Sequence, residues 1–405
     1  MAKATTTMIV CLSLLRVAMA ATYSVTDYGA EADGQTDSTK AFLAAWSSAC
    51  GAARPATIYV PAGRFLVGQA TTFQGPCNNS AVTILVHGIL VAPAGYTSAV
   101  NWLLFKYVDG VSILGGTIDG RGQAFWACKD AGRSCPQGAT SLSVAESKNV
   151  VIRGLTSLNS EMFHISIFGS SSVKVQGAKI IAPGDSPNTD GIHIQMSTEV
   201  TILSTRIKTG DDCISMGQGA SGVWIEKVNC GPGHGISIGS LGGTASEAGV
   251  QNITVTSVFF SGTQNGLRIK TWGRGYSGFV RGVTFAHAVM QDVSYPIVVD
   301  QNYCPGNVNC PGQVQLIPYF FFLYVIKRIA APQSSGVKIS GVSYSDIRGS
   351  SATPVAVKFD CSASNPCSDL SLSDIKLTFE NKEAQAYCKN AEGSTSGTIN
   401  PPSCI

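Results

Sequence analysis

Charged residues are scarce in this chain of 405 residues: Asp, Glu, Lys and Arg make up 13%, against 44% hydrophobic residues. So much apolar material excludes a disordered chain and is enough for one large core. The formal net charge is only +3, and removal of residues 1–20, which carry Lys3 and Arg16 and no acidic residue, would leave +1. Such a small net charge gives no indication of nucleic-acid binding.

Long apolar runs are also missing, so nothing in the sequence predicts a membrane span. The short run "MIVCLSLLRVAMA" follows Lys3 and ends in Ala18-Met19-Ala20, a pattern typical of a secretory signal peptide cleaved before Ala21. We therefore expect a signal peptide over residues 1–20, one domain over residues 21–405, and a secreted, extracellular protein.

Helical periodicity is almost absent after residue 84, which argues against a doubly wound α/β fold with its helical crossovers. Instead, short β-branched runs return every 23 to 30 residues between Val150 and Val283, with a longer step before and after. They begin at Val111, Val150, Val173, Val200, Val223, Ile253, Val283 and Val337. A β-sandwich is the alternative, but its sequence does not repeat a unit of about two dozen residues. The sequence predicts an all-β, right-handed parallel β-helix, in which each coil stacks on the previous one.

One segment does have helical periodicity. In residues 37–50, "DSTKAFLAAWSSAC", Asp37 or Ser38 could cap a helix, and Phe42, Leu43 and Trp46 share one face. Because a solenoid leaves its ends exposed, we expect this helix to cover the N-terminal end.

The cysteine count favours disulfides over metal ligands. Thirteen cysteines are present, and twelve remain once Cys11 is removed with the signal, an even number for an exported protein. Candidate pairs are Cys50/Cys77, Cys128/Cys135, Cys213/Cys230, Cys304/Cys310, Cys361/Cys367 and Cys388/Cys404. Asn78 and Asn252 lie in glycosylation sequons, which is consistent with a secreted glycoprotein.

Polar residues recur at the same spacing as the coils. Asp190 of "NTDG" is followed after 21 residues by Asp211 and Asp212 of "GDD", and after another 23 by His234 of "GHG". Arg268 and Lys270 of "RIK", on one side of a strand, come next, and Tyr303 follows. Each residue alone is more simply interpreted as a turn or surface residue. Together, at coil spacing, they predict one groove.

This set suggests glycosidic bond hydrolysis. Carboxylates in one groove repel one another, so one of them tends to keep a proton and can act as the acid, while another acts as base or nucleophile. The two cations could bind a carboxylate, whereas a neutral glycan would give them no partner. This indicates a sugar acid as substrate.

"NTD", "GDD", "GHG" and "RIK", in this order, resemble the signature motifs of the polygalacturonase family, glycoside hydrolase family 28. "DYGAEADGQTDSTKAF" is also similar, and the resemblance, which covers nearly the whole mature chain, is to plant members of the pollen type, many of them exo-acting. It implies hydrolysis of α-1,4-galacturonosyl linkages in polygalacturonate with inversion and without metal or cofactor. We expect the protein to be a monomer. The resemblance further implies that Asp211 is the general acid, that Asp190 and Asp212 activate water, and that His234 tunes the acid. Substrate binding is then assigned to Asn188, Arg268, Lys270 and Tyr303.

Three other functions stay open. The chain could be an endo-acting enzyme with the same chemistry, a calcium-dependent pectate lyase on the same substrate, or a catalytically impaired protein that only binds pectin in the wall. The adjacent Asp211 and Asp212, with His234, favour hydrolysis over elimination.

The segment after Cys310 departs from the repeat. The step from Val283 to Val337 is 54 residues, and the excess lies at residues 313–333, which contain "LIPYFFFLYVI". This is either an inserted loop or a retained intron in the gene model, and we favour the intron on the length. Sequencing the transcript distinguishes the two.

Overall fold

A computed structural model describes residues 21–95, 99–305, 310 and 334–405. The expected signal peptide and the atypical segment at residues 313–333 lie outside these residues and stay predictions.

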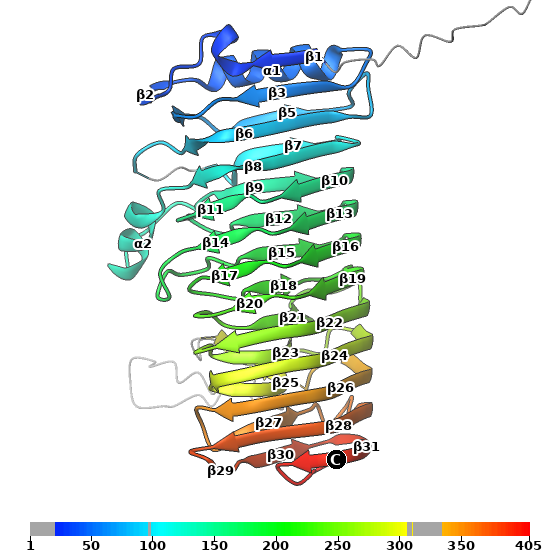
Figure 1. Ribbon diagram of the computed structural model, residues 1–405. Helices are drawn as coiled ribbons and strands as arrows, with labels where there is room; N and C mark the ends of the chain where they lie inside the picture. The colour runs from blue at the N-terminus through cyan, green and yellow to red at the C-terminus, as the bar shows by residue number, and fades with distance from the viewer. Residues whose placement is uncertain (1–20, 96–98, 306–309, 311–333) are drawn as a thin grey trace, which may run out of the picture.

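The described chain winds into a long stack of short parallel strands (Figure 1). Within the described residues, the strands form two sheets, and 20 strands belong to the larger one. We call it sheet A, and its strands are β1 (Ala21–Ser24), β2 (Asp33–Asp37), β3 (Ala56–Val60), β4 (Arg64–Leu66), β6 (Val82–Val91), β8 (Val111–Asp119), β10 (Lys148–Arg153), β11 (Thr156–Leu158), β13 (Ser171–Gln176), β14 (Lys179–Ile181), β16 (Thr198–Leu203), β17 (Arg206–Lys208), β19 (Ser221–Glu226), β20 (Asn229–Cys230), β22 (Val250–Ser261), β24 (Gly278–Val293), β26 (Val337–Ser351), β28 (Cys367–Phe379), β29 (Lys382–Glu383) and β31 (Ala391–Asn400).

The smaller sheet, sheet B, has 11 strands in the described part of the chain. They are β5 (Thr71–Gln74), β7 (Asn101–Lys106), β9 (Thr140–Ala145), β12 (Ile165–Phe168), β15 (Ile192–Gln195), β18 (Ile214–Met216), β21 (Ile236–Leu241), β23 (Asn265–Trp272), β25 (Tyr295–Tyr303), β27 (Val355–Asp360) and β30 (Gln385–Lys389). The strands of successive coils pair in parallel along this sheet. The prediction of a right-handed parallel β-helix is confirmed.

Inward-facing side chains of successive coils stack into continuous apolar ladders. In sheet A, Val150 pairs with Val173 and Val173 with Val200. In sheet B, Ile192 pairs with Ile214, which pairs with Ile236, and all three are fully buried. Because the side chain alternates between the two faces of a strand, the residues beside each buried one point out of the coil. The predicted repeat starts are therefore core positions.

The last predicted repeat start is wrong by five residues. Val283 pairs with Val342, whereas Val337 pairs with Gly278. The pattern "VKISGV" has a small or β-branched residue at several positions, so its composition alone leaves the register undetermined.

Helix α1 (Thr39–Gly51) covers the N-terminal end of the stack, as predicted (Figure 1). Asp37 Oδ1 accepts the Thr39 N–H at 3.0 Å, and Phe42 and Trp46 are buried, but Leu43 is exposed. Its expected place on the buried face is wrong, because small residues of the helix, Ala45 among them, fill that face instead. A one-turn 3-10 helix, η1 (Val25–Tyr28), precedes it.

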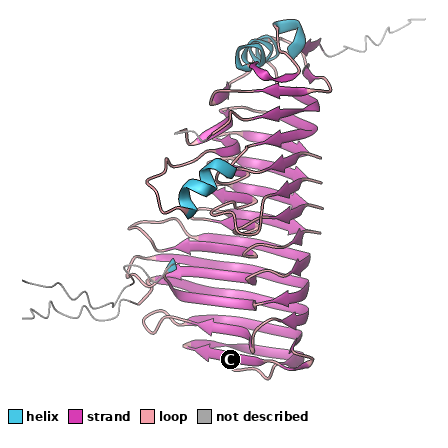
Figure 2. Cartoon of the chain, turned by 90° about the vertical axis from the view of Figure 1, so that its left-hand side faces the viewer, coloured by secondary structure: helices cyan, strands magenta, loops and turns pink. Residues whose placement is uncertain are grey.

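Helix α2 (Gln123–Asp130) stands off the side of the stack (Figure 2). Phe125 and Trp126 are buried there, and with Ala182 they form a small apolar cluster outside the coils. The Cys128–Cys135 disulfide closes the segment. Among the described residues, no helix is both long and apolar enough to cross a membrane.

All six disulfides occur as the sequence predicted, at sequence separations of 6 to 27 residues. Asn78 and Asn252, the sequon asparagines, are both exposed.

Candidate active site

The carboxylates stack because they occupy equivalent places in successive coils. Asp190, Asp212 and His234 each stand two residues before a buried isoleucine that opens a strand of sheet B. Those three isoleucines are in register across β15, β18 and β21. Strands in register lie about 4.8 Å apart. Residues one coil apart in the sequence therefore lie side by side in the structure.

Asp212 is held by two cations. Arg268 Nη2 donates to Asp212 Oδ1 at 2.7 Å, and Lys270 Nζ donates to Oδ2 at 2.8 Å. Ser237 Oγ adds a third bond at 2.8 Å. The Asp212 side chain is only 1% exposed. Lys270, Arg268 and these hydrogen bonds outweigh the effect of burial, so the pKa of Asp212 is lowered and its carboxylate is ionised.

Asp190 has the opposite surroundings. Ser215 Oγ donates to its Oδ2 at 2.6 Å, and no cation lies within ion-pair distance among the described residues. Burial raises the pKa of Asp190 well above 3.8, and the negative charges of Asp211 and Asp212 raise it further. Asp190 therefore binds a proton more tightly than an exposed carboxyl group does.

Asp211 is the accessible carboxylate of the three, with 20% of its side chain exposed. His234 Nδ1 lies 3.0 Å from Asp211 Oδ1. Gly235 permits this placement, because its φ of +93° lies in the left-handed region and a Cβ there would meet Asn265 O at 2.2 Å. The "GHG" motif thus places an imidazole against a carboxyl group.

Ligand atoms of Asp211, Asp212 and His234 lie within 4.8 Å of one another, a grouping that could in principle hold a metal ion. Asp212, however, already binds two cationic side chains. Their positive charge opposes a further cation, so the arrangement fits acid–base chemistry better than metal binding.

The predicted substrate-binding cations have a partner within the protein. We inferred a sugar acid because Arg268 and Lys270 would otherwise lack an anion, and Asp212 supplies that anion. The premise was wrong, because both cations point back toward an earlier coil. The spacing in the sequence could not show this direction. Further N–H groups of both side chains are still available to a substrate.

Tyr303 lies at the end of β25, where its ring centroid is 5.2 Å from Lys270 Nζ and 5.4 Å from the Trp272 ring. The structure therefore brings Tyr303 to the cationic side of the site. Asn188 precedes Asp190 in the loop before β15. It is exposed, and its Oδ1 accepts a hydrogen bond from Lys129 Nζ at 2.9 Å.

Lys129 is a residue that the sequence analysis missed. It comes from α2, 59 residues before Asn188, and its Nζ lies 5.0 Å from the Phe125 ring centroid. Burial lowers the pKa of Lys129, and the negative charge of Asp211 acts against that effect. It has no carboxylate ion-pair partner among the described residues. No coil spacing could reveal it, because α2 lies outside the repeat.

Two serines of the site were also missed. Ser237 bridges Asp212 and Arg268, whose Nε donates to Ser237 Oγ at 2.9 Å. Ser215 connects Asp190 to a further residue, His193, whose Nδ1 lies 2.8 Å from Ser215 Oγ. Each occupies the second position of its strand, so the alternation of the strand could have indicated them.

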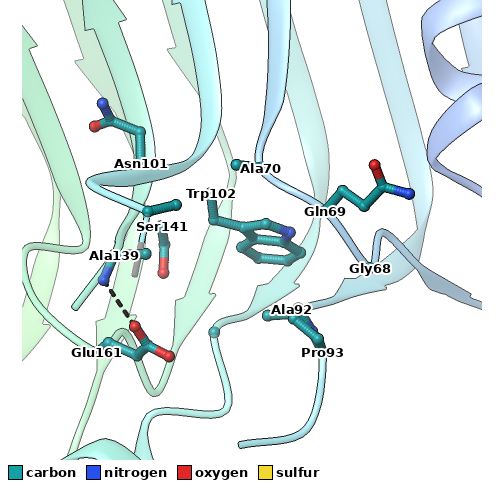
Figure 3. Close-up of a pocket in the computed structure, with 12 residues that line it drawn as sticks. Gly68, Gln69, Ala70, Ala92, Pro93, Asn101, Trp102, Ala139, Ser141 and Glu161 are labelled. Atoms are coloured by element: carbon teal, nitrogen blue, oxygen red, sulfur yellow. Dashed lines mark hydrogen bonds between the residues drawn. The ribbon is translucent and has the colours of Figure 1, made fainter. Parts of the chain in front are cut away.

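A separate hollow lies nearer the N-terminus, around Trp102 (Figure 3). Glu161 at its edge is 5% exposed and accepts the Ala139 N–H at 2.7 Å, as the dashed line marks. Trp126 Nε1 donates to the Glu161 carbonyl. These contacts fasten the α2 segment to the stack, so we give Glu161 a structural role.

The family model of "Glycosyl hydrolases family 28" matches residues 50–318 and 323–399. A "Polygalacturonase" of Prunus persica is 54% identical over 393 residues, which cover 96% of this chain and 95% of that protein. An "Exopolygalacturonase" of Platanus acerifolia is 39% identical, with 93% of this chain and 95% of that protein covered.

Among solved structures, an endo-xylogalacturonan hydrolase of Aspergillus tubingensis has a TM-score of 0.78 at 24% identity, with 93% of this chain and 99% of that chain covered. This likeness supports the fold. The family match and the two plant relatives extend over nearly the whole chain, and the family match includes every stacked carboxylate. The resemblance stated from the motifs is confirmed: the chain belongs to glycoside hydrolase family 28.

Proposed function

We propose that this glycoside hydrolase cleaves α-1,4-galacturonosyl linkages of polygalacturonate, the acidic chain of pectin. The observation that carries the proposal is the difference between neighbouring carboxyl groups. Asp212 is held ionised by Arg268 and Lys270, whereas Asp190 is buried without a cation. Glycoside hydrolysis requires neighbouring carboxyl groups with different affinities for a proton, because one group must give a proton while another accepts one. The names of the plant relatives support galacturonan as the substrate.

In the proposed reaction, Asp211 gives its proton to the glycosidic oxygen as the bond to the anomeric carbon breaks. Its accessibility and its contact with His234 support this role. A water molecule attacks the anomeric carbon and passes its proton to a carboxylate. Asp212, ionised in the unliganded protein, supports that step, and Asp190 joins it once it has lost its own proton. Attack opposite to the leaving group gives inversion.

The substrate carboxylate is proposed to bind between Lys270, Arg268 and Tyr303. The remaining N–H donors of both cations and the aromatic ring beside Lys270 support this. Asn188 would contact the sugar from the loop before β15, where Lys129 adds a positive charge. These cations favour an anionic substrate over a neutral glycan.

For the mode of action we propose exo cleavage that releases galacturonic acid. Plant relatives named exopolygalacturonase support it, at 39% and 38% identity. Endo cleavage is the second candidate, and one observation favours it: a groove continues along sheet B from His193 as far as β7. A groove open on that side has room for a chain that extends past the site.

Product analysis on de-esterified polygalacturonate tests these proposals together. Saturated monomer from the first minutes is expected for the exo-hydrolase. Mixed saturated oligomers would favour the endo mode, and unsaturated ends would identify a lyase. We expect the same rate with and without a chelator of divalent cations, because the proposed reaction has no step that needs calcium. A folded protein without any product would contradict the proposed activity and favour a pectin-binding role.

We further propose that the protein is secreted to the cell wall as a monomer. Six disulfides support an oxidising compartment. Recovery of a glycosylated, monomeric protein from the medium of secreting cells is the expected result. An intracellular protein with free thiols would contradict the proposal.

A further inference from the structure

Arg268 and the two serines that contact the catalytic carboxyl groups belong to one outward-facing row, which continues well beyond the site. Arg268 pairs with Ser237, Ser237 with Ser215, and Ser215 with His193. The same row then goes on through three more strands, in which His193 pairs with Ser166, Ser166 with Ser143 and Ser143 with Leu104. Three strand spacings amount to about 14 Å, which is enough for more than one sugar unit.

A groove of about 320 Å³ follows this part of the row, from β15 to β7. We call it the β7–β15 groove, and it is lined by Val100, Asn101, Leu104, Gln137, Gly138, Thr140, Ser143, Ala145, Met162, Phe163, Ser166, Phe168, His193 and Gln195. Phe168 is 43% exposed, and Phe163 stacks on His193 with ring centroids 4.5 Å apart.

Within the described residues, the lining of the β7–β15 groove carries no Lys, Arg, Asp or Glu. His193 is the titratable group of this lining, and burial lowers the pKa of that imidazole. The His193 imidazole is therefore neutral at neutral pH and adds no positive charge to the groove. The lining is neutral, with hydroxyl and amide groups between apolar and aromatic surfaces.

Two lysines lie at the two ends of the groove. Lys106 follows Leu104 on the same face of β7, but its Nζ lies 3.3 Å from Glu146 Oε1, so its charge is balanced. At the other end, Lys129 Nζ lies 3.8 Å from Met162 Sδ and 2.9 Å from Asn188 Oδ1. Positive charge is thus concentrated beside the catalytic carboxyl groups.

We propose that the β7–β15 groove binds methyl-esterified galacturonosyl units, while only the unit beside Arg268 and Lys270 needs a free carboxylate. The inference rests on the proposed function and names the substrate class on one side of the same site. A carboxylate moved from water onto Leu104 or Phe168 would lose hydration and gain no cation. A methyl ester has no charge to desolvate, and its methyl group gains apolar contact. The substrate is therefore a partly esterified chain, cut next to a free acid.

The test uses galacturonate oligomers that carry one methyl ester at a defined unit, with cleavage sites read by mass spectrometry. For the wild-type protein, an ester on a unit in the groove leaves kcat/KM unchanged or raises it. An ester on the unit beside Arg268 lowers kcat/KM at least about tenfold, because a charge-assisted contact is lost. An equal loss for esters at every position would overturn the proposal.

A charge introduced into the groove gives an independent measurement. Phe168→Lys places a cation on the exposed face and should shift the preference toward the free acid by about fivefold. Trp224→Lys is the control, because Trp224 is 45% exposed but lies on β19 of sheet A. Unchanged preference in a folded Phe168→Lys protein would also overturn the inference. Absence of cleavage on fully de-esterified oligomers would instead contradict the proposed function itself.

Discussion

Lys270 Nζ lies 2.8 Å from Asp212 Oδ2, although the two residues are 58 positions apart in the chain. Asp190, in the same active site, is another buried carboxyl group and has no such partner among the described residues. Opposite effects on stability follow for equivalent substitutions of Asp212 and Asp190.

Asp212→Asn should destabilise the protein. Arg268 and Lys270 would keep their buried positive charges without the carboxylate, and breaking such a pair costs about 3–5 kcal/mol. Urea unfolding at pH 7 measures the change. Asp346→Asn is the control, because its contacts with His287 and Arg348 are exposed and should contribute no more than about 1 kcal/mol. An equal, small effect in both variants would contradict the assignment.

Asp190→Asn should instead raise stability at neutral pH while abolishing turnover. The pKa of Asp190 is raised in the folded state, so its stabilising effect is complete below the unfolded pKa of 3.8 and is lost as pH rises through the folded pKa. The asparagine amide carries no charge and avoids that loss, which is about 1.4 kcal/mol for each unit by which the pKa is raised. Melting temperatures should diverge from pH 4 upward. A variant that melts lower than wild type at pH 7 would refute the account.

Substitutions of His234 should separate a hydrogen-bonding role from mere packing. His234→Ala removes the contact at 3.0 Å from Asp211 and should lower kcat about a hundredfold, with a small change in KM. His234→Gln can still donate to the carboxyl group and should recover part of kcat. If the two variants lose kcat equally, the hydrogen bond to Asp211 does not explain the role of His234 in catalysis.

The stereochemistry of the first product tests the roles given to the three carboxyl groups. Inversion at an α-linkage releases the β-anomer, whereas a covalent intermediate would release the α-anomer. Proton NMR during the first turnovers, before mutarotation, distinguishes them. We expect the β-anomer, and α-anomer as first product would require a nucleophilic carboxylate in place of the activated water.

Lys129→Gln should raise KM for de-esterified polygalacturonate about fivefold, since a positive charge beside Asn188 is removed. The effect should fade as salt increases, because ions screen the attraction. Lys148→Gln, an exposed lysine paired with Asp109, is the matched control and should leave KM unchanged. A salt-independent loss in Lys129→Gln would indicate a structural role.

The sequence alone determined the architecture and the stacking of the site. Buried β-branched residues that return once per coil are covered when successive coils stack on one another. Stacking makes residues such as Asp190 and Asp212 neighbours. The even cysteine count of an exported chain indicated disulfides and suggested candidate pairs, whereas the connectivity itself came from the structure. The same local periodicity located Arg268 and Lys270 on one face of β23.

Only the tertiary structure decided what these side chains do for one another. Arg268 and Lys270 bind Asp212, whereas Asp190 is left without a cation among the described residues. This difference depends on the direction in which each side chain points between coils. Lys129 reaches the site from α2, a segment outside the repeat, so no periodicity could locate it. Local patterns determine which residues face inward or outward, whereas pKa values and charge pairing depend on distances between coils. Those distances exist only once the chain is wound.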